Sequence, residues 1–194
     1  MMLSAKPNRA RGFSLTELLV TLTIIGVTSA IGFPMLTEYV DDAAVSTQAD
    51  LMLDTLNYTR SEAVKRNTRV TMCRSATGTS CAVGVTSGDW RMGWIVFVDD
   101  TVGGTVGQVD ATETVLRAQS KFSGRGQLVA TGGVQNFVSY ASNGQTRDQA
   151  GLAIAGNFFM CGKSVKTKRR RIALTAGTGW VGATILSPAS SCSA

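Results

Sequence analysis

The chain of 194 residues contains no histidine. Ser-His-Asp triads and Cys-His pairs use histidine as their base, so neither arrangement can be built. A nucleophile elbow, a phosphate-binding loop and a dinucleotide fingerprint are missing as well. Without histidine or a Cys-x-x-Cys pair, the usual spacing of a zinc site is also absent. The sequence therefore predicts a protein that is not an enzyme and needs no cofactor or metal.

Proline is scarce, and neither glycine nor proline occurs between Leu36 and Asn67. Small and apolar residues recur in this stretch at the spacing of one helix face. They are Val45, Ala49, Met52, Leu56, Thr59 and Ala63. The charged positions are expected to face outward or toward neighbouring molecules, and they are Asp41, Asp42, Asp50, Asp54, Arg60 and Arg66. Residues 34–67 are therefore predicted to form an amphipathic helix, which Pro34 bends at its start.

Charge is almost missing from residues 13–33, where Glu17 is the one ionisable side chain. At about 1.5 Å per residue this run measures roughly 30 Å as a helix, enough to cross a membrane once. The preceding leader, residues 1–12, carries Lys6, Arg9 and Arg11 and no acidic residue. This asymmetry predicts a single membrane span with a cytoplasmic start and an exported C-terminal domain.

Placing the Glu17 carboxylate in lipid costs free energy, and residues 13–33 contain no Lys or Arg to pair with it. Cleavage after Gly12 would create a positive amino terminus at Phe13, which a neighbouring copy can present to Glu17. The alternative is a capping box, in which Ser14 and Glu17 bond each other's backbone at a helix start. The first interpretation makes Glu17 an assembly residue, and the second makes it a local stabiliser.

These features together resemble the class III signal of type IV pilins and type II secretion pseudopilins. The matching positions are Gly12 before the cut, Phe13 as the first mature residue, Glu17 as its fifth and Pro34 near the membrane exit. The resemblance implies cleavage and N-methylation by a prepilin peptidase. It also implies a single-pass inner-membrane protein with a periplasmic C-terminal domain. This protein would partner other pilins through its N-terminal helix and move from the inner membrane into a filament.

The remainder, residues 68–194, is predicted to be a β head in which glycine-rich loops separate short antiparallel strands. Together with residues 34–67 it is expected to form one globular domain of the α+β class. The predicted strands are 69–73, 91–98, 114–119, 134–140, 152–160, 170–175 and 180–186. Segments 101–107 and 123–133 are expected to be surface loops because they are rich in Gly, Thr and Ser. Trp90, Trp94 and Trp180 are expected in the core, and the adjacent Asp99 and Asp100 in solvent.

Two further blocks are similar to the GspH/FimT group of minor pilins and pseudopilins, which includes FimU-like proteins. They are Asn57–Arg66, leading to Val70 and Cys73, and Trp90–Asp99. The resemblance implies a lollipop-shaped molecule, a long transmembrane and amphipathic helix carrying a small β-sandwich-like head. It also implies a minor subunit, at or near the tip of a type IV pilus or type II secretion pseudopilus, that aids filament assembly.

Four cysteines follow the membrane run in a compartment predicted to be oxidising, so disulfides are expected. Three pairings are possible. The favoured one joins Cys73 to Cys81 across a hairpin and Cys161 to Cys192 at the chain end. Each bridge is expected to stabilise the fold by roughly 2–4 kcal/mol.

Basic residues are concentrated late in the chain. From Lys121 onward there are nine Lys and Arg against one acidic residue. Six of the nine are Lys163, Lys166, Lys168, Arg169, Arg170 and Arg171. Such a run is either a phosphate footprint for DNA or a solvated strand edge protected from aggregation.

In the resembling group, members that take up DNA bind it through a C-terminal Gly-Arg-x-Arg element. The corresponding segment here is Gly177-Thr178-Gly179-Trp180, which lacks both arginines. The primary hypothesis is therefore a structural minor pilin or pseudopilin. The alternative is a pilus-borne DNA-binding module that uses the basic run upstream.

Overall fold

The computed structural model describes residues 12–82, 88–100, 102–122, 126–164, 166–188 and 191–192. The basic residues of the predicted leader, within residues 1–11, lie outside these ranges. The chain divides into two compact units, Met1–Tyr39 and Val40–Ala194. A single helix, α1 (Leu15–Arg66), contributes to both.

In the first unit, the large apolar side chains of α1 are exposed; Leu15 is 81% exposed, and those after it have fractional exposures between 53% and 73%. Those after Leu15 are Leu18, Leu19, Val20, Leu22, Ile24, Ile25, Val27, Phe33, Leu36 and Tyr39. No described residue covers them, so this part of the helix buries little apolar surface within the chain. Its backbone is held by its own helical hydrogen bonds.

In the second unit, one face of α1 is buried as its sequence period predicts. Val45, Ala49, Met52, Leu56, Thr59 and Ala63 all point into the core. Arg60 departs from the prediction, since it is half-buried and donates from Nε to the carbonyl oxygen of Gly144 at 3.1 Å and from Nη2 to that of Thr178 at 3.2 Å. Loop carbonyls thus satisfy a guanidinium that was expected to face solvent or a neighbour.

The end of α1 is set by its last turn. Asn67 has a φ of 53°, in the left-handed region that stops a helix. The amide of Thr68 then donates to the carbonyl oxygen of Ala63 at 3.2 Å, which satisfies one of the helix's last acceptors. Lys65 and Arg66 complement the negative end of the helix dipole and both pair with Glu62.

The strands form two antiparallel sheets. Sheet A has the order β3-β2-β1-β5, formed by β3 (Val115–Gln119), β2 (Trp94–Val98), β1 (Val70–Arg74) and β5 (Phe137–Tyr140). Sheet B has the order β4-β6-β7-β8, formed by β4 (Gln127–Gly132), β6 (Gly156–Cys161), β7 (Arg169–Leu174) and β8 (Val181–Leu186). The α+β prediction is confirmed.

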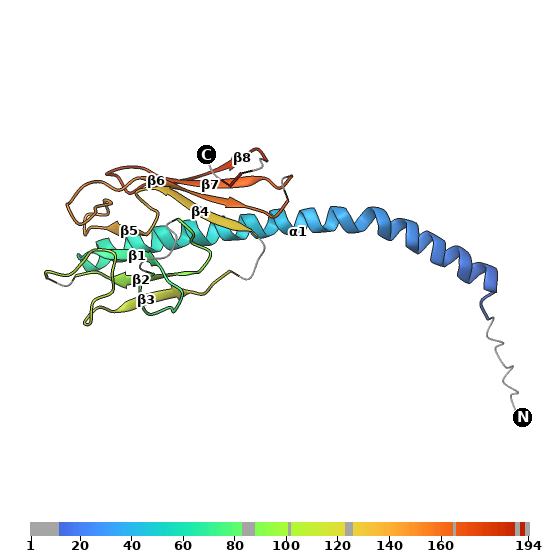
Figure 1. Ribbon diagram of the computed structural model, residues 1–194, viewed down its shortest axis with the longest axis horizontal. Coiled ribbons are helices and arrows are strands. Elements are labelled where there is room, and N and C mark those ends of the chain that lie inside the picture. Colours follow the sequence, from blue (N-terminus) through green and yellow to red (C-terminus); the bar gives the residue numbers. More distant parts are fainter. Residues whose placement is uncertain are drawn as a thin grey trace, which may run out of the picture. The chain divides into compact units, whose positions relative to one another are not determined.

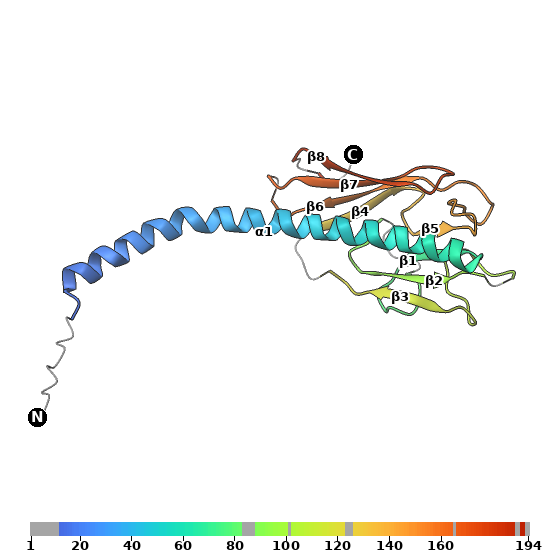
Figure 2. The same ribbon diagram turned by 180° about the vertical axis from the view of Figure 1, so that it is seen from behind.

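A single main core joins the second half of α1 to both sheets. Figure 1 and Figure 2 show this part of the helix lying alongside sheet A and sheet B. The largest fully buried side chains of this core include Trp90, Trp94, Tyr140, Phe158 and Met52. Trp90 packs edge-on against Phe158 with ring centroids 5.2 Å apart, and its Nε1 donates to the carbonyl oxygen of Val134 at 3.1 Å. Core placement of Trp90 and Trp94 is therefore confirmed.

The prediction of a loop over residues 123–133 is wrong for β4 (Gln127–Gly132). Leu128 and Ala130 alternate inward, and β4 pairs along its length with β6. The many glycines around it, which favoured a loop, instead allow close backbone approach. A Cβ on Gly126 would lie 2.7 Å from the carbonyl oxygen of Cys161. Pairing between distant segments thus overrode the local composition.

Several predicted strands begin later than expected. The segment before β2 is a turn, closed by the amide of Gly93 donating to the carbonyl oxygen of Trp90 at 3.2 Å. Strand β5 begins at Phe137 rather than residue 134, and β6 begins at Gly156 rather than residue 152. In both cases apolar residues continue outside the strand because they pack into the core from a loop, as Val134 and Ile154 do.

Candidate functional site

The first candidate site is the start of α1. Gly12 and Phe13 precede the helix, Glu17 lies in its first turn, and all three are exposed. The Ser14 and Thr16 hydroxyls bond each other at 2.7 Å. The reciprocal bonds of a capping box between Ser14 and Glu17 are not made among the described residues. The Glu17 carboxylate thus has no hydrogen-bond partner in the described part of the chain.

Three threonines of the same segment bond the carbonyl oxygens of the preceding turn. Thr21, Thr23 and Thr28 each donate to a carbonyl oxygen at 2.8 Å. Such bonds satisfy hydroxyl groups without water. Judged by hydropathy, none of the helices in the described ranges is long and apolar enough to cross a membrane. The inner-membrane span over residues 13–33 stays a prediction.

The second candidate site is the basic run that ends in β7. Lys163, Lys166 and Lys168 precede the strand and are exposed. Arg169, Arg170 and Arg171 are the first three residues of β7 and are half-buried. The chain contains no acidic residue after Asp148. The predicted phosphate contacts therefore fall into an exposed lysine group and a partly engaged arginine group.

The three arginines alternate between the two faces of β7. Arg170 donates from Nη2 to the hydroxyl of Ser46 on α1 at 3.0 Å. Arg171 donates from Nε to the hydroxyl of Thr184 on β8 at 3.2 Å. Successive side chains of a strand point to opposite faces, so Arg169 lies on the same face as Arg171. We call this the outer face of sheet B, opposite to α1.

Arg169 holds the end of the chain. Its Nε donates to the carbonyl oxygen of Ser187 at 3.0 Å and its Nη1 to that of Ser191 at 3.1 Å. On the α1 side, the backbone amide of Lys168 donates to Asp42 Oδ1 at 3.1 Å. The basic run thus has an internal structural role that the sequence pattern did not indicate.

The disulfides are those favoured from the sequence. Cys73 bonds Cys81, eight residues away, with Cα atoms 5.6 Å apart. Cys161 on β6 bonds Cys192, 31 residues away, with Cα atoms 5.8 Å apart. The first bridge closes the loop after β1, and the second fastens the chain end to sheet B. The predicted pairing is confirmed.

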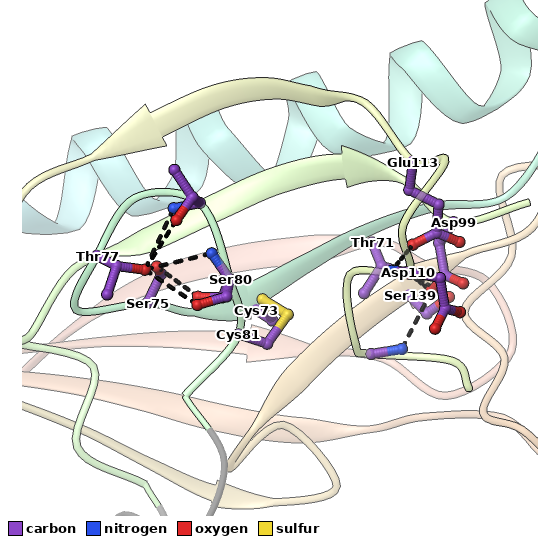
Figure 3. The surroundings of a disulfide bond; sticks show 12 residues. Thr71, Cys73, Ser75, Thr77, Ser80, Cys81, Asp99, Asp110, Glu113 and Ser139 are labelled. Atoms are coloured by element: carbon purple, nitrogen blue, oxygen red, sulfur yellow. Dashed lines mark hydrogen bonds between the residues drawn. A yellow bond between two sulfur atoms is a disulfide. The ribbon is translucent and has the colours of Figure 1, made fainter. Parts of the chain in front are cut away.

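Asp99 was expected in solvent beside Asp100 and is instead buried, with 7% of its surface exposed. Its Oδ2 accepts from the Thr71 hydroxyl at 2.5 Å and from the Gly107 amide at 3.1 Å. Burial raises the pKa of the Asp99 carboxyl, and the bonds from Thr71 and Gly107 oppose that rise. Figure 3 shows Asp99 between Thr71, Ser139 and the loop that carries Asp110 and Glu113.

This polar cluster ties a long loop to sheet A. A 2.8 Å hydrogen bond joins the hydroxyls of Thr71 and Ser139, on β1 and β5. Arg69 donates to Ser139 Oγ at 3.0 Å. Within the described ranges, no group of three His, Cys, Asp or Glu side chains is placed to hold a metal ion. The one sequence signal for the cluster was the polar Thr71 between the apolar Val70 and Met72 of β1.

Trp180 differs from the other two tryptophans because 66% of its surface is exposed. It follows the turn between β7 and β8, and its carbonyl oxygen accepts from the amide of Thr175 at 3.0 Å. The prediction that it lies in the core is wrong. An aromatic residue at the start of a strand matches a core pattern, but here the turn places it beyond the sheet's buried face.

Two family models match the sequence. Residues 48–179 match the family described as type II transport protein GspH. Residues 7–33 match the prokaryotic N-terminal methylation motif. Among curated protein sequences, no significant match is found. The two matches do not overlap, and the α1 residues 34–47 lie between them; one match falls in each unit of the chain.

Solved structures with a similar fold include two crystal forms of the type IV minor pilin FimU from Pseudomonas aeruginosa. The form in space group P21 is 14% identical, with a TM-score of 0.53, over 75% of this chain and 92% of that chain. The form in space group P65 is 15% identical, with a TM-score of 0.48, over 72% of this chain and 91% of that chain. At this identity the first form's likeness establishes a shared fold.

Proposed function

This chain belongs to the family of type II transport protein GspH, and on that premise we propose that it is a minor subunit at or near the tip of a type IV pilus or type II secretion pseudopilus. The observation that carries the proposal is the presence of an N-terminal methylation motif and a GspH region in one chain. A protein of this class works by assembly, and its candidate sites are contact surfaces.

Processing is the first step of the proposed function. A prepilin peptidase would cut between Gly12 and Phe13 and methylate the new amino terminus. Exposure of both residues ahead of α1 supports access by the peptidase. Residues 13–33 would anchor the chain in the inner membrane, with the second unit in the periplasm, until the subunit enters the filament.

Glu17 is proposed as the assembly residue. No group in the described part of the chain neutralises its carboxylate, which is costly in an apolar surrounding. The amino terminus at Phe13 of a neighbouring subunit would supply the opposite charge. The exposed apolar side chains of α1 in the first unit would then pack against other subunits' helices.

The test is the intact mass of the protein extracted from membranes and from sheared filaments. We expect loss of residues 1–12 and addition of one methyl group. Replacement of Gly12 by Leu should block cleavage, whereas Gly26→Leu, at a helix position where a Cβ meets no described atom within 4 Å, should not. Retention of residues 1–12 in filaments would contradict the proposal. Neighbouring genes for other minor pilins, or for a secretion apparatus, would then distinguish pilus from pseudopilus.

DNA binding is the second candidate, and the exposed lysine group favours it. Lys163, Lys166 and Lys168 are exposed on the segment that precedes β7. Arg171 follows them in the sequence and lies on the outer face of sheet B. Arg169 and Arg170 are engaged by the chain end and by Ser46. About three or four phosphates can therefore be contacted at once, without sequence preference.

The salt dependence of duplex DNA binding by the full-length protein in detergent tests this candidate. At about 0.9 per contact, log affinity should fall with log salt at a slope near −3 to −4. Charge reversal at Lys166 and Lys168 should reduce the slope by roughly two, while reversal at Lys65 and Arg66 should not change it. Absence of binding at low salt would exclude the candidate.

A further inference from the structure

Strand β8 is the open border of sheet B. It pairs with β7 alone, and the described residues make no backbone hydrogen bond to its other side. The opposite border, β4, is covered: Ala130 donates to the carbonyl oxygen of Gly88 at 2.7 Å, and Trp90 donates to that of Leu128 at 3.0 Å. Figure 1 shows β8 at the limit of the sheet.

This border lacks the protection that sheet edges usually carry. The sequence of β8, VGATIL, has no charged residue and no proline. Ala183, Thr184 and Ile185 are exposed, Ile185 by 59%. Soluble proteins place lysine, proline or a bulge on such edges, because an open apolar strand is a template for another strand. An unprotected edge of six residues is therefore suited to strand addition.

The end of the chain is held away from this edge. Arg169 binds the carbonyl oxygens of Ser187 and Ser191, and Cys192 is bonded to Cys161 on β6. These contacts draw the segment after β8 back toward β7 and β6. Among the described residues, none therefore occupies the position of a further strand beside β8.

Arg171 supplies the charge selectivity. It lies directly opposite Thr184 in the β7–β8 register and reaches toward β8, where its Nε bonds the Thr184 hydroxyl. No described group accepts from its two terminal nitrogens, and no acidic residue follows Asp148 in the chain. A carboxylate on the outer face of an added strand would accept hydrogen bonds from these two nitrogens and neutralise the guanidinium charge.

The other face of β8 has a different preference. Ile185 lies opposite Arg170 in the register, so it shares the face on which Arg170 reaches α1. An added strand would place its alternate side chains beside Ile185 and Ala183, where apolar groups are favoured. The two faces of an added strand thus call for opposite chemistry.

We propose that the open edge of β8 binds an extended segment of a partner protein in which acidic and apolar residues alternate, the acidic ones pairing with Arg171 and the apolar ones covering Ile185. This surface is separate from the α1 assembly segment and goes beyond the proposed function. The edge would let the subunit attach such a partner through backbone hydrogen bonds between strands.

The experiment uses the full-length protein in detergent and a fluorescent peptide of alternating Asp and Val. We expect saturable binding, measured by anisotropy, together with slowed hydrogen exchange of the β8 amides. A peptide with the same side chains and alternate N-methylated amides should bind about tenfold or more weakly, because it cannot complete the ladder. A Lys and Val peptide should bind as weakly.

Matched variants separate the two faces. Arg171→Gln should weaken the Asp and Val peptide about tenfold and remove its advantage over the Lys and Val peptide. Its control is Arg66→Gln at the end of α1. Ile185→Ser should weaken binding about threefold, and its control is Val64→Ser, another exposed apolar residue. Both controls should bind like the unaltered protein.

Several results would overturn the proposal. Equal binding of the N-methylated peptide, or binding without β8 protection, would exclude strand addition. If the β8 amides exchange slowly without peptide and light scattering gives the mass of a dimer, a second copy of the chain would be the occupant. Protection of β8 by a DNA duplex would assign Arg171 to phosphate. Failure of the Asp and Val peptide to bind the unaltered protein would also refute the acidic partner.

Discussion

Leu22 and Leu56 are two leucines of the same helix in opposite surroundings. Leu22 is 60% exposed, whereas Leu56 is fully buried between the helix and the sheets. Local sequence makes both segments helical, but only residues 40–66 bury an apolar face within the chain. The first segment can therefore gain stability from its apolar residues only by contacting something else, while the second already stabilises the head. Matched substitutions in the two segments should separate assembly from folding.

The largest effect on folding is expected from Leu56→Ala. Removing a fully buried leucine side chain leaves a cavity, and the free energy of unfolding should fall by about 2–5 kcal/mol. Leu22→Ala, its partner in the comparison, should leave the unfolding of the second unit unchanged and reduce entry into filaments. Denaturant unfolding followed by tryptophan fluorescence measures the first effect. Similar destabilisation by both would contradict the division between the segments.

The next effect is expected from the bridge at the chain end. Replacing Cys161 and Cys192 together by Ala should lower the free energy of unfolding by about 2–4 kcal/mol, because the bridge restricts a segment of the unfolded chain. Hydrogen exchange should speed up in β8 before it does in β6. Unchanged stability would show that Arg169 alone suffices to hold Ser187 and Ser191.

A smaller effect concerns pH. The folded state raises the pKa of Asp99, so it binds this proton more tightly than the unfolded chain does. The contribution of Asp99 to stability should therefore fall as the pH rises above its ordinary pKa of 3.8 and through the raised value. The stability difference between the unaltered protein and Asp99→Asn, followed from pH 3 upward, should show this decline.

Asp100→Asn is the control for that measurement. Asp100 is the exposed neighbour of Asp99, so its substitution should change the free energy of unfolding by no more than about 0.5 kcal/mol. If the stability difference between the unaltered protein and Asp99→Asn instead rises with pH, the hydrogen bonds from Thr71 and Gly107 have a larger effect on the pKa of Asp99 than burial does.

The smallest effect on folding is expected at Glu17. Glu17→Ala should leave the free energy of unfolding within about 0.5 kcal/mol, because this exposed side chain has no contact partner in the described chain. Incorporation into filaments should nevertheless fall, measured by pulldown of sheared filaments. Thr21→Ala, one turn later, should not lower it. Normal incorporation of Glu17→Ala would refute pairing with a neighbour's amino terminus.

Much of the fold was predictable because local periodicity carried it. The buried stripe from Val45 to Ala63 follows the helical repeat, and most strands follow short apolar runs between glycines. The missed strand, β4, has glycines at both ends, so its composition indicates a loop. Its pairing with β6 and residues 88–90 is a contact between distant segments, which local composition does not report.

The candidate sites divide in the same way. The order of residues alone determined the processing motif, the apolar run with its one carboxylate, the absence of histidine chemistry and the concentration of basic residues, because each is a local pattern or a composition. Tertiary structure alone decided which arginines are engaged, that Asp99 is buried beside Thr71, and that β8 is left as an open edge. Those outcomes depend on which strands become neighbours, and hydrogen bonds between distant residues settle that only in the folded chain.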